Sequence, residues 1–532
     1  MTNESNGPIK VVIAETIAQE GVDALTSTCE VVDLVGAERG DVVAAMSDAS
    51  AIIVRSATKV DREMIDAAPR LRVIGRAGIG TDNIDVEAAT ERGIMVVNAP
   101  HANTISAAEH TMALILAQAR RVAEADRSLR GGKWERSSFQ GVELHGKTLG
   151  VLGLGKIGTL VAQRASAFGM RIIAFDPYVS EDRARRLGIE MMSLEEVLAI
   201  SDIITVHLPR TPKTENLINA EAIDGMKQGS RVVNVARGGI VNEQDLADAV
   251  SSGRLGGAAV DVFDTEPTTD SPLFAVPQIT VTPHLGASTK EAQGKAGIAV
   301  AESVAAALQG DLVLSAVNLD LGPAVSARVL PFIDLAENLG KIFTAISRGL
   351  PSELIVTVRG DLAEEPTKPL ALSALKGALA SSSEVAVSYV NTPLIAEARG
   401  VSVIEESQIE IDDYQSTVRI SGTVDGVQRT VAGTVMARKG PVLVGLEGYA
   451  IEVPLTRYML LVRNADVPGC IGRVGTYLGE IGNNIADMVV GRGPDDEAAM
   501  MGIALDGPLG SSGLEGLLAL EGIEAARFVD LS

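Results

Sequence analysis

Residues 146–158 read GKTLGVLGLGKIG, and this stretch decides the fold of the part of the chain around it. The run TLGVL is strand-like, Gly153, Gly155 and Gly158 follow in the spacing G-x-G-x-x-G, and 159–168 is helical in character. In a dinucleotide-binding fold the first glycine permits the tight turn, the second lets a pyrophosphate approach, and the third lets helix and strand pack closely. The N-terminus of the helix then offers free N–H groups to the phosphates.

The segment after this helix specifies the nucleotide. A second strand is predicted at 171–175, and Asp176 follows it, 18 residues after Gly158. A carboxylate there accepts hydrogen bonds from a ribose diol and repels a 2′-phosphate, and the next residues, Pro177 and Tyr178, supply no cation. The sequence therefore predicts an α/β, Rossmann-type domain that binds NAD rather than NADP.

Composition limits the classes of protein to which the chain can belong. Its 532 residues suggest three to four domains, and its net charge of −23 disfavours binding to a nucleic-acid backbone. The two cysteines, Cys29 and Cys470, cannot build a disulfide framework or a Cys-based zinc site. The chain has no apolar run of 18 residues and no signal-peptide pattern in its polar start. We expect a cytoplasmic protein without a metal site or membrane contact.

The alternation of strand-like and helix-like stretches predicts two α/β domains in the first 317 residues. A flavodoxin-like substrate domain is expected at 1–100 and 288–317, because a long helix at 288–308 would let the chain cross back to it. The NAD-binding domain is expected at 101–287 and begins with a long helix at 104–118. Strands of the first domain are predicted at 9–14, 30–34, 51–54, 71–74 and 94–97.

Two further domains are predicted after residue 317. An α+β intervening domain is expected at 318–453, with β-branched stretches at 409–411 and 417–420 and a hairpin at Asp425-Gly426, a pair typical of a type I′ turn. A domain at 456–532 has the order β-α-β-β-α-β of a ferredoxin-like fold. Its strands are predicted at 458–463, 485–490, 500–505 and 525–530, its helices at 471–480 and 513–520, and a turn at 494–496.

Three strand ends offer side chains for oxidising a hydroxy acid. Histidine suits the base because its pKa of about 6.5 is near neutral, and His284 follows an apolar run in VTPHLGAST. The segment VDVFDTEP supplies Asp261, Asp264 and Glu266 as carboxylates that could support the imidazole. Arg237, in NVARGG, could hold a substrate carboxylate with its planar fork.

The other four histidines are weaker candidates for the base. His207 ends the apolar run ITVH and could face the cofactor crevice. His110 lies in an apolar helical stretch, where a packed or hydrogen-bonded histidine is expected, and His101 and His145 resemble turn residues with no evident partner.

The blocks GKTLGVLGLGKIG, VVNVARGGIVNE, AAVDVFDTEP and VTPHLGAST together resemble the D-isomer-specific 2-hydroxyacid dehydrogenase family. The resemblance implies that Arg237 binds the substrate carboxylate, Glu266 supports the histidine, and His284 is the acid–base residue. Ile79 stands where related enzymes often have a threonine near the cofactor. The NAD contacts that the resemblance implies are Gly153, Gly155, Lys156, Ile157, Gly158, Asp176, His207, Val235, Ala236, Arg237, Asp261, His284, Gly286 and Ala287.

The first domain indicates a substrate with a second anionic group. Arg55 and Arg76 both follow strand-like runs, and Asn103 precedes the long helix, whose N-terminus favours an anion. The layout of the whole chain resembles family members that oxidise D-3-phosphoglycerate to 3-phosphohydroxypyruvate, the first step toward serine. Another D-2-hydroxyacid dehydrogenase, or an NAD-sensing regulator without enzymatic activity, is the alternative.

The last domain, with the segment RNADVPGCIGRVGTYLGEIGNNI, resembles an ACT domain. This resemblance implies that Asn464, Asp466 and Asn484 bind an effector, with serine the expected ligand, at a subunit interface. The only tryptophan, Trp134, lies in a polar, glycine-flanked stretch that suits an interface anchor. The resemblance implies a dimer contact there, with Arg136 reaching the neighbouring subunit, in a homo-oligomer of two or four chains.

Overall fold

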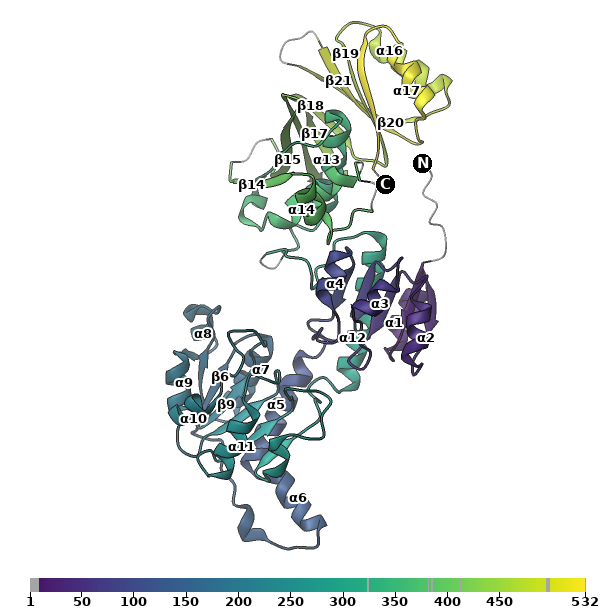
Figure 1. Ribbon diagram of the computed structural model, residues 1–532. Helices are drawn as coiled ribbons and strands as arrows, with labels where there is room; N and C mark the ends of the chain where they lie inside the picture. Colours follow the sequence, from purple (N-terminus) through teal and green to yellow (C-terminus); the bar gives the residue numbers. More distant parts are fainter. Residues whose placement is uncertain are drawn as a thin grey trace.

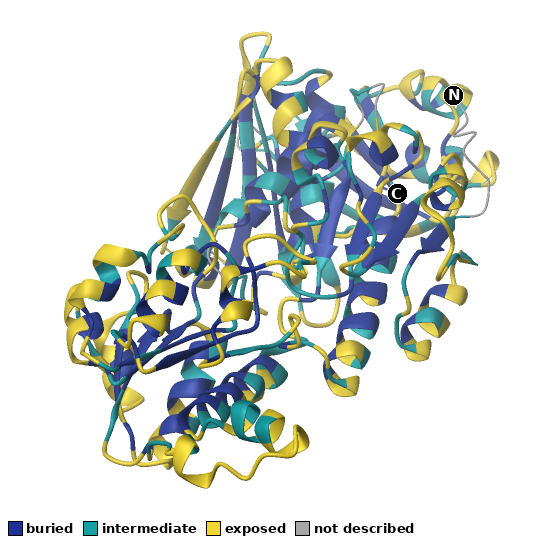
Figure 2. Ribbon diagram, turned by 60° about the horizontal axis from the view of Figure 1, so that its bottom comes forward, coloured by how far each residue is buried: buried dark blue, intermediate teal, exposed yellow. Residues whose placement is uncertain are grey.

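The computed structural model describes residues 9–322, 325–380, 382–383, 386–410, 413–493 and 498–531, arranged around four β-sheets (Figure 1). The turn predicted at 494–496 lies outside these residues. Most strand residues are buried, whereas the helices expose their outer faces to solvent (Figure 2). None of the helices in the described part of the chain is long and apolar enough to cross a membrane.

The first sheet has five parallel strands in the order β2-β1-β3-β4-β5, which is the flavodoxin-like order. The long helix α12 (Lys290–Gln309) packs on this sheet, where Val300 and Val304 lie directly over Gly75. The other elements of this domain are β1 (Lys10–Ile13), α1 (Gln19–Thr26), β2 (Glu30–Asp33), α2 (Arg39–Ala45), β3 (Ala51–Val54), α3 (Arg62–Asp66), β4 (Val73–Arg76), α4 (Val86–Glu91) and β5 (Met95–Asn98).

The second sheet has seven parallel strands in the order β12-β11-β10-β9-β6-β7-β8. Its central strands are apolar and fully buried, as expected for a parallel sheet covered on both faces. The strands are β6 (Thr148–Leu152), β7 (Arg171–Phe175), β8 (Glu190–Met191), β9 (Ile203–Val206), β10 (Arg231–Asn234), β11 (Gly257–Val260) and β12 (Ile279–Val281). The helices are α5 (Thr104–Ala119), α6 (Val122–Arg130), α7 (Lys156–Ala167), α8 (Glu181–Arg186), α9 (Leu194–Ile200), α10 (Ala220–Gly225) and α11 (Glu243–Ser251), with 3-10 turns η1 (Arg136–Phe139) and η2 (Pro272–Ala275).

Helix α6 and the segment after it form an arm at the far end of this domain (Figure 1). None of the residues of α6 is buried. Val122, Leu129 and Trp134 are exposed on it, Trp134 to 84%. Large apolar side chains exposed together on a protruding segment are typical of an interaction surface.

The third sheet belongs to the predicted intervening domain and has the order β14-β13-β15-β16-β17-β18. The predicted hairpin is confirmed, because Asp425 and Gly426 join β15 to β16 with φ of 51° and 78°. Of the β-branched stretch at 409–411, residues 409 and 410 lie just beyond β14, which ends at Gln408, and 411 is not among the described residues. The elements are α13 (Pro331–Ser347), β13 (Glu353–Gly360), η3 (Asp361–Glu364), α14 (Lys368–Ala380), α15 (Thr392–Ala398), β14 (Ser402–Gln408), β15 (Ser416–Val424), β16 (Val427–Met436), β17 (Gly440–Leu446) and β18 (Tyr449–Pro454).

The fourth sheet has the ferredoxin-like order β20-β21-β19-β22 and the predicted β-α-β-β-α-β sequence of elements. Leu460 faces the core beneath the helices, whereas Met459 and Leu461 face a core shared with the third sheet. Both faces of this sheet are therefore covered. The elements are β19 (Tyr458–Ala465), α16 (Cys470–Glu480), β20 (Ile485–Arg492), β21 (Ala498–Leu505), α17 (Ser511–Leu518) and β22 (Ile523–Asp530).

Candidate active site

A cavity of about 1080 Å³ lies between the five-stranded and the seven-stranded domains. It sits beyond the carboxyl ends of β9, β10, β11 and β12, the edge at which ligands bind in open α/β sheets. Most of the predicted catalytic, substrate and cofactor residues line it. These are Arg55, Arg76, Asn103, Ile157, His207, Val235, Ala236, Arg237, Glu266, His284, Gly286 and Ala287.

The glycine turn between β6 and α7 has the shape of a phosphate cradle. A Cβ on Gly158 would lie 2.0 Å from the carbonyl oxygen of Gly153, so that position accepts only glycine. A Cβ on Gly155 would meet no atom within 4 Å, which leaves open space above the first turn of α7. Asp176 Oδ2 accepts a hydrogen bond from Leu154 N at 2.8 Å and thereby ties the turn to the end of β7. The turn fits a dinucleotide pyrophosphate.

Helix α7 begins at Lys156, three residues before the predicted start, because Gly155 already has the extended backbone of an N-cap. Lys156 Nζ lies 2.8 Å from the ring nitrogens of His101. His101 therefore has a partner that was not evident from the sequence. No sequence pattern predicts this contact, because the two residues are 55 positions apart.

His207 lies at the wall of the cavity, after β9. Its Nε2 lies 2.9 Å from Thr205 Oγ1. Burial lowers the pKa of His207 to about 4, so the ring is uncharged at neutral pH. An uncharged ring beside a cofactor crevice can contribute packing and one hydrogen bond, but no positive charge.

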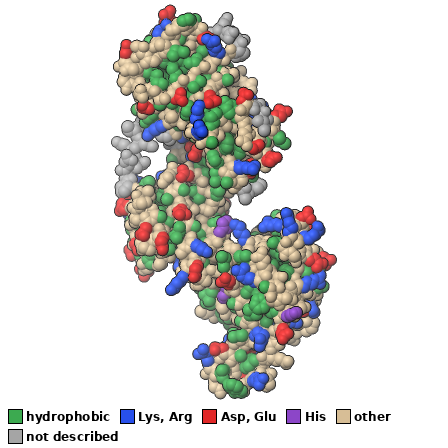
Figure 3. Space-filling model, turned by 180° about the vertical axis from the view of Figure 1, so that it is seen from behind, with side chains coloured by type: hydrophobic (Ala, Val, Ile, Leu, Met, Phe, Trp, Pro, Cys, Tyr) green, Lys and Arg blue, Asp and Glu red, His purple; other side chains and the backbone are tan. Residues whose placement is uncertain are grey.

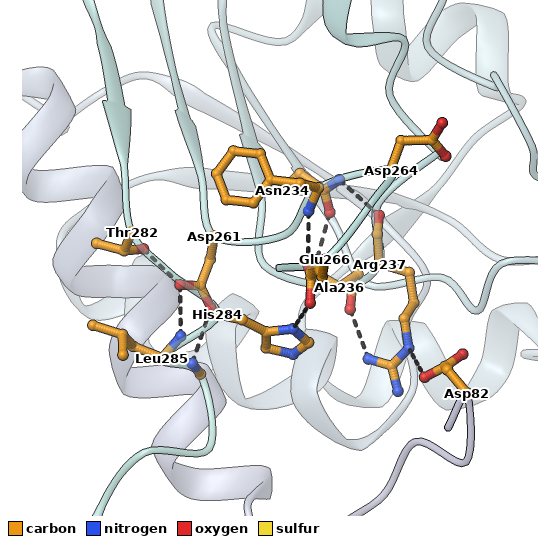
Figure 4. A network of polar contacts seen from close by, with 12 residues as sticks. Asp82, Asn234, Ala236, Arg237, Asp261, Asp264, Glu266, Thr282, His284 and Leu285 are labelled. Atoms are coloured by element: carbon orange, nitrogen blue, oxygen red, sulfur yellow. Dashed lines mark hydrogen bonds and ion pairs between the residues drawn. The ribbon is translucent and has the colours of Figure 1, made fainter. Parts of the chain in front are cut away.

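His284 and Glu266 meet across two neighbouring strand ends (Figure 4). His284 Nδ1 lies 2.6 Å from Glu266 Oε2, and because an ionised carboxylate only accepts, Nδ1–H is the donor. Burial by itself would raise the pKa of Glu266, but the hydrogen bonds from His284 and from Phe263 N outweigh it and lower that pKa. The free Nε2 of His284 is left to face the cavity.

Asp261, one of the predicted NAD contacts, is buried and hydrogen-bonded within the protein. Its side chain is completely buried, and it accepts hydrogen bonds from Leu285 N at 2.8 Å, Gly286 N at 2.9 Å and Thr282 Oγ1 at 2.6 Å. Burial alone would raise its pKa, whereas hydrogen bonds, first among them the one from His110, hold that pKa below its usual range. The carboxylate therefore shapes the loop that carries His284, and its contact with NAD stays a prediction.

Arg237 is held by a residue that sequence reasoning missed. Asn234, at the end of β10, donates from Nδ2 to Arg237 O at 2.9 Å and accepts from Ala236 N at 3.0 Å. The available signal was an amide side chain directly after the apolar pair Val232-Val233 at the end of a strand. Arg237 Nε also lies 3.8 Å from Oδ2 of Asp82, an exposed residue of the other domain (Figure 4).

The five-stranded domain brings two further arginines to the same cavity. Burial lowers the pKa of the Arg76 guanidinium, and the positive charges of Arg55 and Arg237 lower it further. Arg76 Nε is buried without a hydrogen-bond partner among the described residues, and the same is true of Asn103 Oδ1. Glu15, which sequence reasoning also missed, fixes the loop of Arg55 by accepting from Arg55 N at 2.8 Å. The arrangement suits a ligand with more than one negative charge.

The three predicted effector residues do not meet within one chain. Asn464 and Asp466 lie at the end of β19 that pairs with Ala498 and Ala499, and Asp466 Oδ2 lies 2.9 Å from Arg492 Nε. Asn484 precedes β20 at the opposite end of the sheet and donates to Asp506 at 2.7 Å. No cluster of three His, Cys, Asp or Glu that could hold a metal occurs in the part of the chain that the structure describes.

Two family models match the chain. The D-isomer specific 2-hydroxyacid dehydrogenase NAD binding domain matches residues 112–286, and the D-3-phosphoglycerate dehydrogenase intervening domain matches 328–447. The D-3-phosphoglycerate dehydrogenase of Mycobacterium leprae is 48% identical over 93% of this chain and 94% of its own length. That of Archaeoglobus fulgidus is 41% identical over 98% of this chain and 100% of its own length. The chain belongs to the D-isomer specific 2-hydroxyacid dehydrogenase family, in the D-3-phosphoglycerate dehydrogenase branch.

Two solved structures are each similar to more than half of the chain. The TT0316 protein of Thermus thermophilus is 34% identical, with a TM-score of 0.54, over 58% of this chain and 100% of its own. The NAD-dependent formate dehydrogenase of Staphylococcus aureus, solved with NAD, is 31% identical, with a TM-score of 0.51, over 56% of this chain and 95% of its own. The predicted family, the α/β fold and NAD as cofactor are confirmed.

The pKa of His207 predicts how stability depends on pH. The ring has a folded-state pKa of about 4 and an unfolded value near 6.5, so the unfolded chain binds more protons between these values. The stability of the wild type therefore decreases as pH falls through this window. Urea unfolding measures the free energy of unfolding at pH 7.5 and at pH 5. We expect the decrease between these two pH values to be about 2 kcal/mol smaller in His207→Gln than in the wild type. Equal losses in both proteins, with the exposed His145→Gln as control, would contradict the assignment.

Proposed function

We propose that the protein catalyses the NAD-dependent oxidation of D-3-phosphoglycerate to 3-phosphohydroxypyruvate, the first step of serine biosynthesis. The observation that carries the proposal is the 2.6 Å contact between His284 and Glu266 at a cavity that three arginines also line. Relatives named D-3-phosphoglycerate dehydrogenase, similar over nearly the whole chain, support this substrate.

The proton of the substrate hydroxyl goes to His284. Its Nδ1–H is held by Glu266, so Nε2 is the basic atom that faces the cavity. The lowered pKa keeps Glu266 ionised at neutral pH, and its negative charge offsets the positive charge that the imidazole gains with the proton. NAD, when bound, accepts a hydride from the carbon that bears this hydroxyl.

The substrate's two anionic ends are held from opposite sides of the cavity. Arg237, in the NAD-binding domain, takes the carboxylate with its planar fork. Arg55 and Arg76, in the substrate domain, take the phosphate, and Asn103 lies beside them. A bound phosphate compensates the mutual repulsion of these arginines and gives the buried Arg76 Nε an acceptor. The carboxylate is thus fixed beside the base.

The glycine turn after β6 and the strand ends that line the cavity also fit the cofactor. Gly153, Gly155 and Gly158 would hold the pyrophosphate, and Asp176 would accept from the ribose. The remaining contacts we propose are Lys156, Ile157, His207, Val235, Ala236, Arg237, Asp261, His284, Gly286 and Ala287.

Turnover with purified protein tests the activity directly. We expect NADH, followed by its absorbance, to form from NAD and D-3-phosphoglycerate at alkaline pH. His284→Asn should reduce kcat by about 10²–10⁴-fold, because the proton acceptor is lost, while NAD binding measured by calorimetry persists. D-lactate and D-glycerate serve as comparison substrates. Absence of turnover in both directions would favour an NAD-sensing regulator, and a preference for lactate would favour another dehydrogenase of the family.

The phosphate site makes a separate prediction. Arg55→Ala should raise the KM for D-3-phosphoglycerate by about 10- to 100-fold, because one charge-assisted contact is lost, and should leave the KM for NAD unchanged. Arg72→Ala, an exposed arginine of the same domain outside the cavity, is the matched control. An unchanged KM in Arg55→Ala would exclude this arginine from phosphate binding.

We infer that the protein works in the cytoplasm as a homo-oligomer whose last domain is a regulatory ACT domain. The exposed Trp134 and the neighbouring Arg136 support a subunit contact along the arm, and the solution mass tests it. Because Asn464 and Asp466 lie at the opposite end of the sheet from Asn484, an effector that touches all three must bind between two copies.

Serine tests the regulatory part of this proposal. We expect millimolar L-serine to lower the rate of the wild-type enzyme and to have a much weaker effect on Asp466→Ala, because the carboxylate that would bind the amine is lost. D-serine is the control ligand. An unchanged rate of the wild type over the millimolar range would remove serine as the effector.

A further inference from the structure

Helix α5 connects the two sides of the active-site cavity. Asn103 at its start lines the cavity, and Ser106 Oγ lies 2.8 Å from Oγ1 of Thr289, the N-cap of α12. Further along, Met112 and Ile115 pack in the core beneath the seven-stranded sheet. The helix is therefore anchored at the boundary between the domains and also in the interior of the NAD-binding domain.

His110 extends from the middle of α5 toward the loop that carries His284. Its Nε2 lies 3.2 Å from Asp261 Oδ1 and 3.2 Å from Thr282 Oγ1. The side chain is 18% exposed, whereas the Asp261 carboxylate that it touches is completely buried. A buried carboxylate depends on each of its donors, because no solvent replaces one that is lost.

The chemistry of the three groups fixes which atom donates. The ionised Asp261 carboxylate only accepts, and the Thr282 hydroxyl donates its one hydrogen to Asp261 Oδ1 at 2.6 Å. Both neighbours of His110 Nε2 therefore present lone pairs to it. The nitrogen must carry a hydrogen, and it supplies Oδ1 with a donor that comes from outside the loop.

The same carboxylate holds the loop in an unusual backbone conformation. Asp261 accepts from Leu285 N and Gly286 N, the two amides that follow His284. His284 itself has φ of 52°, a left-handed conformation that is uncommon for a residue other than glycine. Such a conformation persists only where the surroundings hold it, and here they include the hydrogen bonds to Asp261.

We propose that His110 is a positioning residue for the dehydrogenase reaction: its Nε2–H fixes Asp261, and Asp261 fixes the loop that aims His284 at the substrate. The role rests on the proposed function of His284 and is distinct from proton transfer, because His110 contacts Asp261 and Thr282 and does not line the cavity. It assigns a function to a histidine whose place in an apolar helix predicts a packed or hydrogen-bonded side chain without a role in the reaction.

Two substitutions distinguish the effect of the hydrogen bond that Nε2 donates from the effect of the volume of the ring. His110→Leu keeps the volume and removes the hydrogen bond, whereas His110→Gln can place an amide N–H near the position of Nε2. Thr111→Val, at the next position of α5, is the matched control, because among the described residues the Thr111 hydroxyl donates to Ala107 O of its own helix and to no other element. Thermal unfolding of each variant establishes that it folds.

We expect His110→Leu to lower kcat about tenfold or more, with the KM for D-3-phosphoglycerate changed less than about threefold, because the arginines that bind substrate are untouched. His110→Gln should recover most of the lost kcat, and Thr111→Val should match wild type. Hydrogen exchange of the peptide that spans 281–289 gives a readout independent of turnover. The amides of Leu285 and Gly286 should exchange about tenfold faster in His110→Leu and near the wild-type rate in His110→Gln.

Wild-type kcat and wild-type exchange in His110→Leu would overturn the proposal. Equal loss in His110→Leu and His110→Gln would also overturn it, because the donor nitrogen would then not be the cause, and so would a loss confined to KM. Failure of the proposed function itself is recognised separately, since the wild-type protein would then show no turnover of D-3-phosphoglycerate, while the exchange measurement would still report on the loop.

Discussion

A charge that is removed from water has to find its hydrogen bonds inside the protein, and Asp261 is the place where this requirement shapes the active site. The carboxylate directly follows the buried strand β11, and its donors come from the loop after β12 and from helix α5. Because these donors come from separate segments, the hydrogen bonds to the carboxylate fix the positions of these segments relative to one another. The position of His284, and with it the contact to Glu266, follows from this arrangement.

The sequence was most informative where a chemical type and a position in a strand coincided. Parallel strands bring their carboxyl ends to one edge of a sheet, so the sequence alone assigns Arg237, Glu266 and His284 to one crevice. The glycine spacing located the dinucleotide turn for the same reason, because each glycine answers a steric demand of the backbone. The roles of these residues in binding and catalysis remain predictions.

Contacts between distant segments were not predictable in the same way. Asn234 and Glu15 act through hydrogen bonds to backbone atoms, and such bonds leave no pattern in the sequence. The partners of His101 and His110, Lys156 and Asp261, come from other elements, so the neighbours along the chain do not identify them. In the third sheet the strand after α15 ends at Gln408, although the β-branched residues continue beyond it. On the face drawn in Figure 3, acidic and basic side chains both occur over the surface.

The location of the only tryptophan has a spectroscopic consequence. Aromatic residues make up 3% of the chain, and the one indole stands on the arm beyond α6, 84% exposed, instead of in a core. Its emission in a single chain therefore resembles that of an indole in water whether the four sheets are folded or unfolded. Excitation at the red edge of the absorption band selects this indole. Its fluorescence should therefore change when a second chain covers the arm and change little when the chain unfolds.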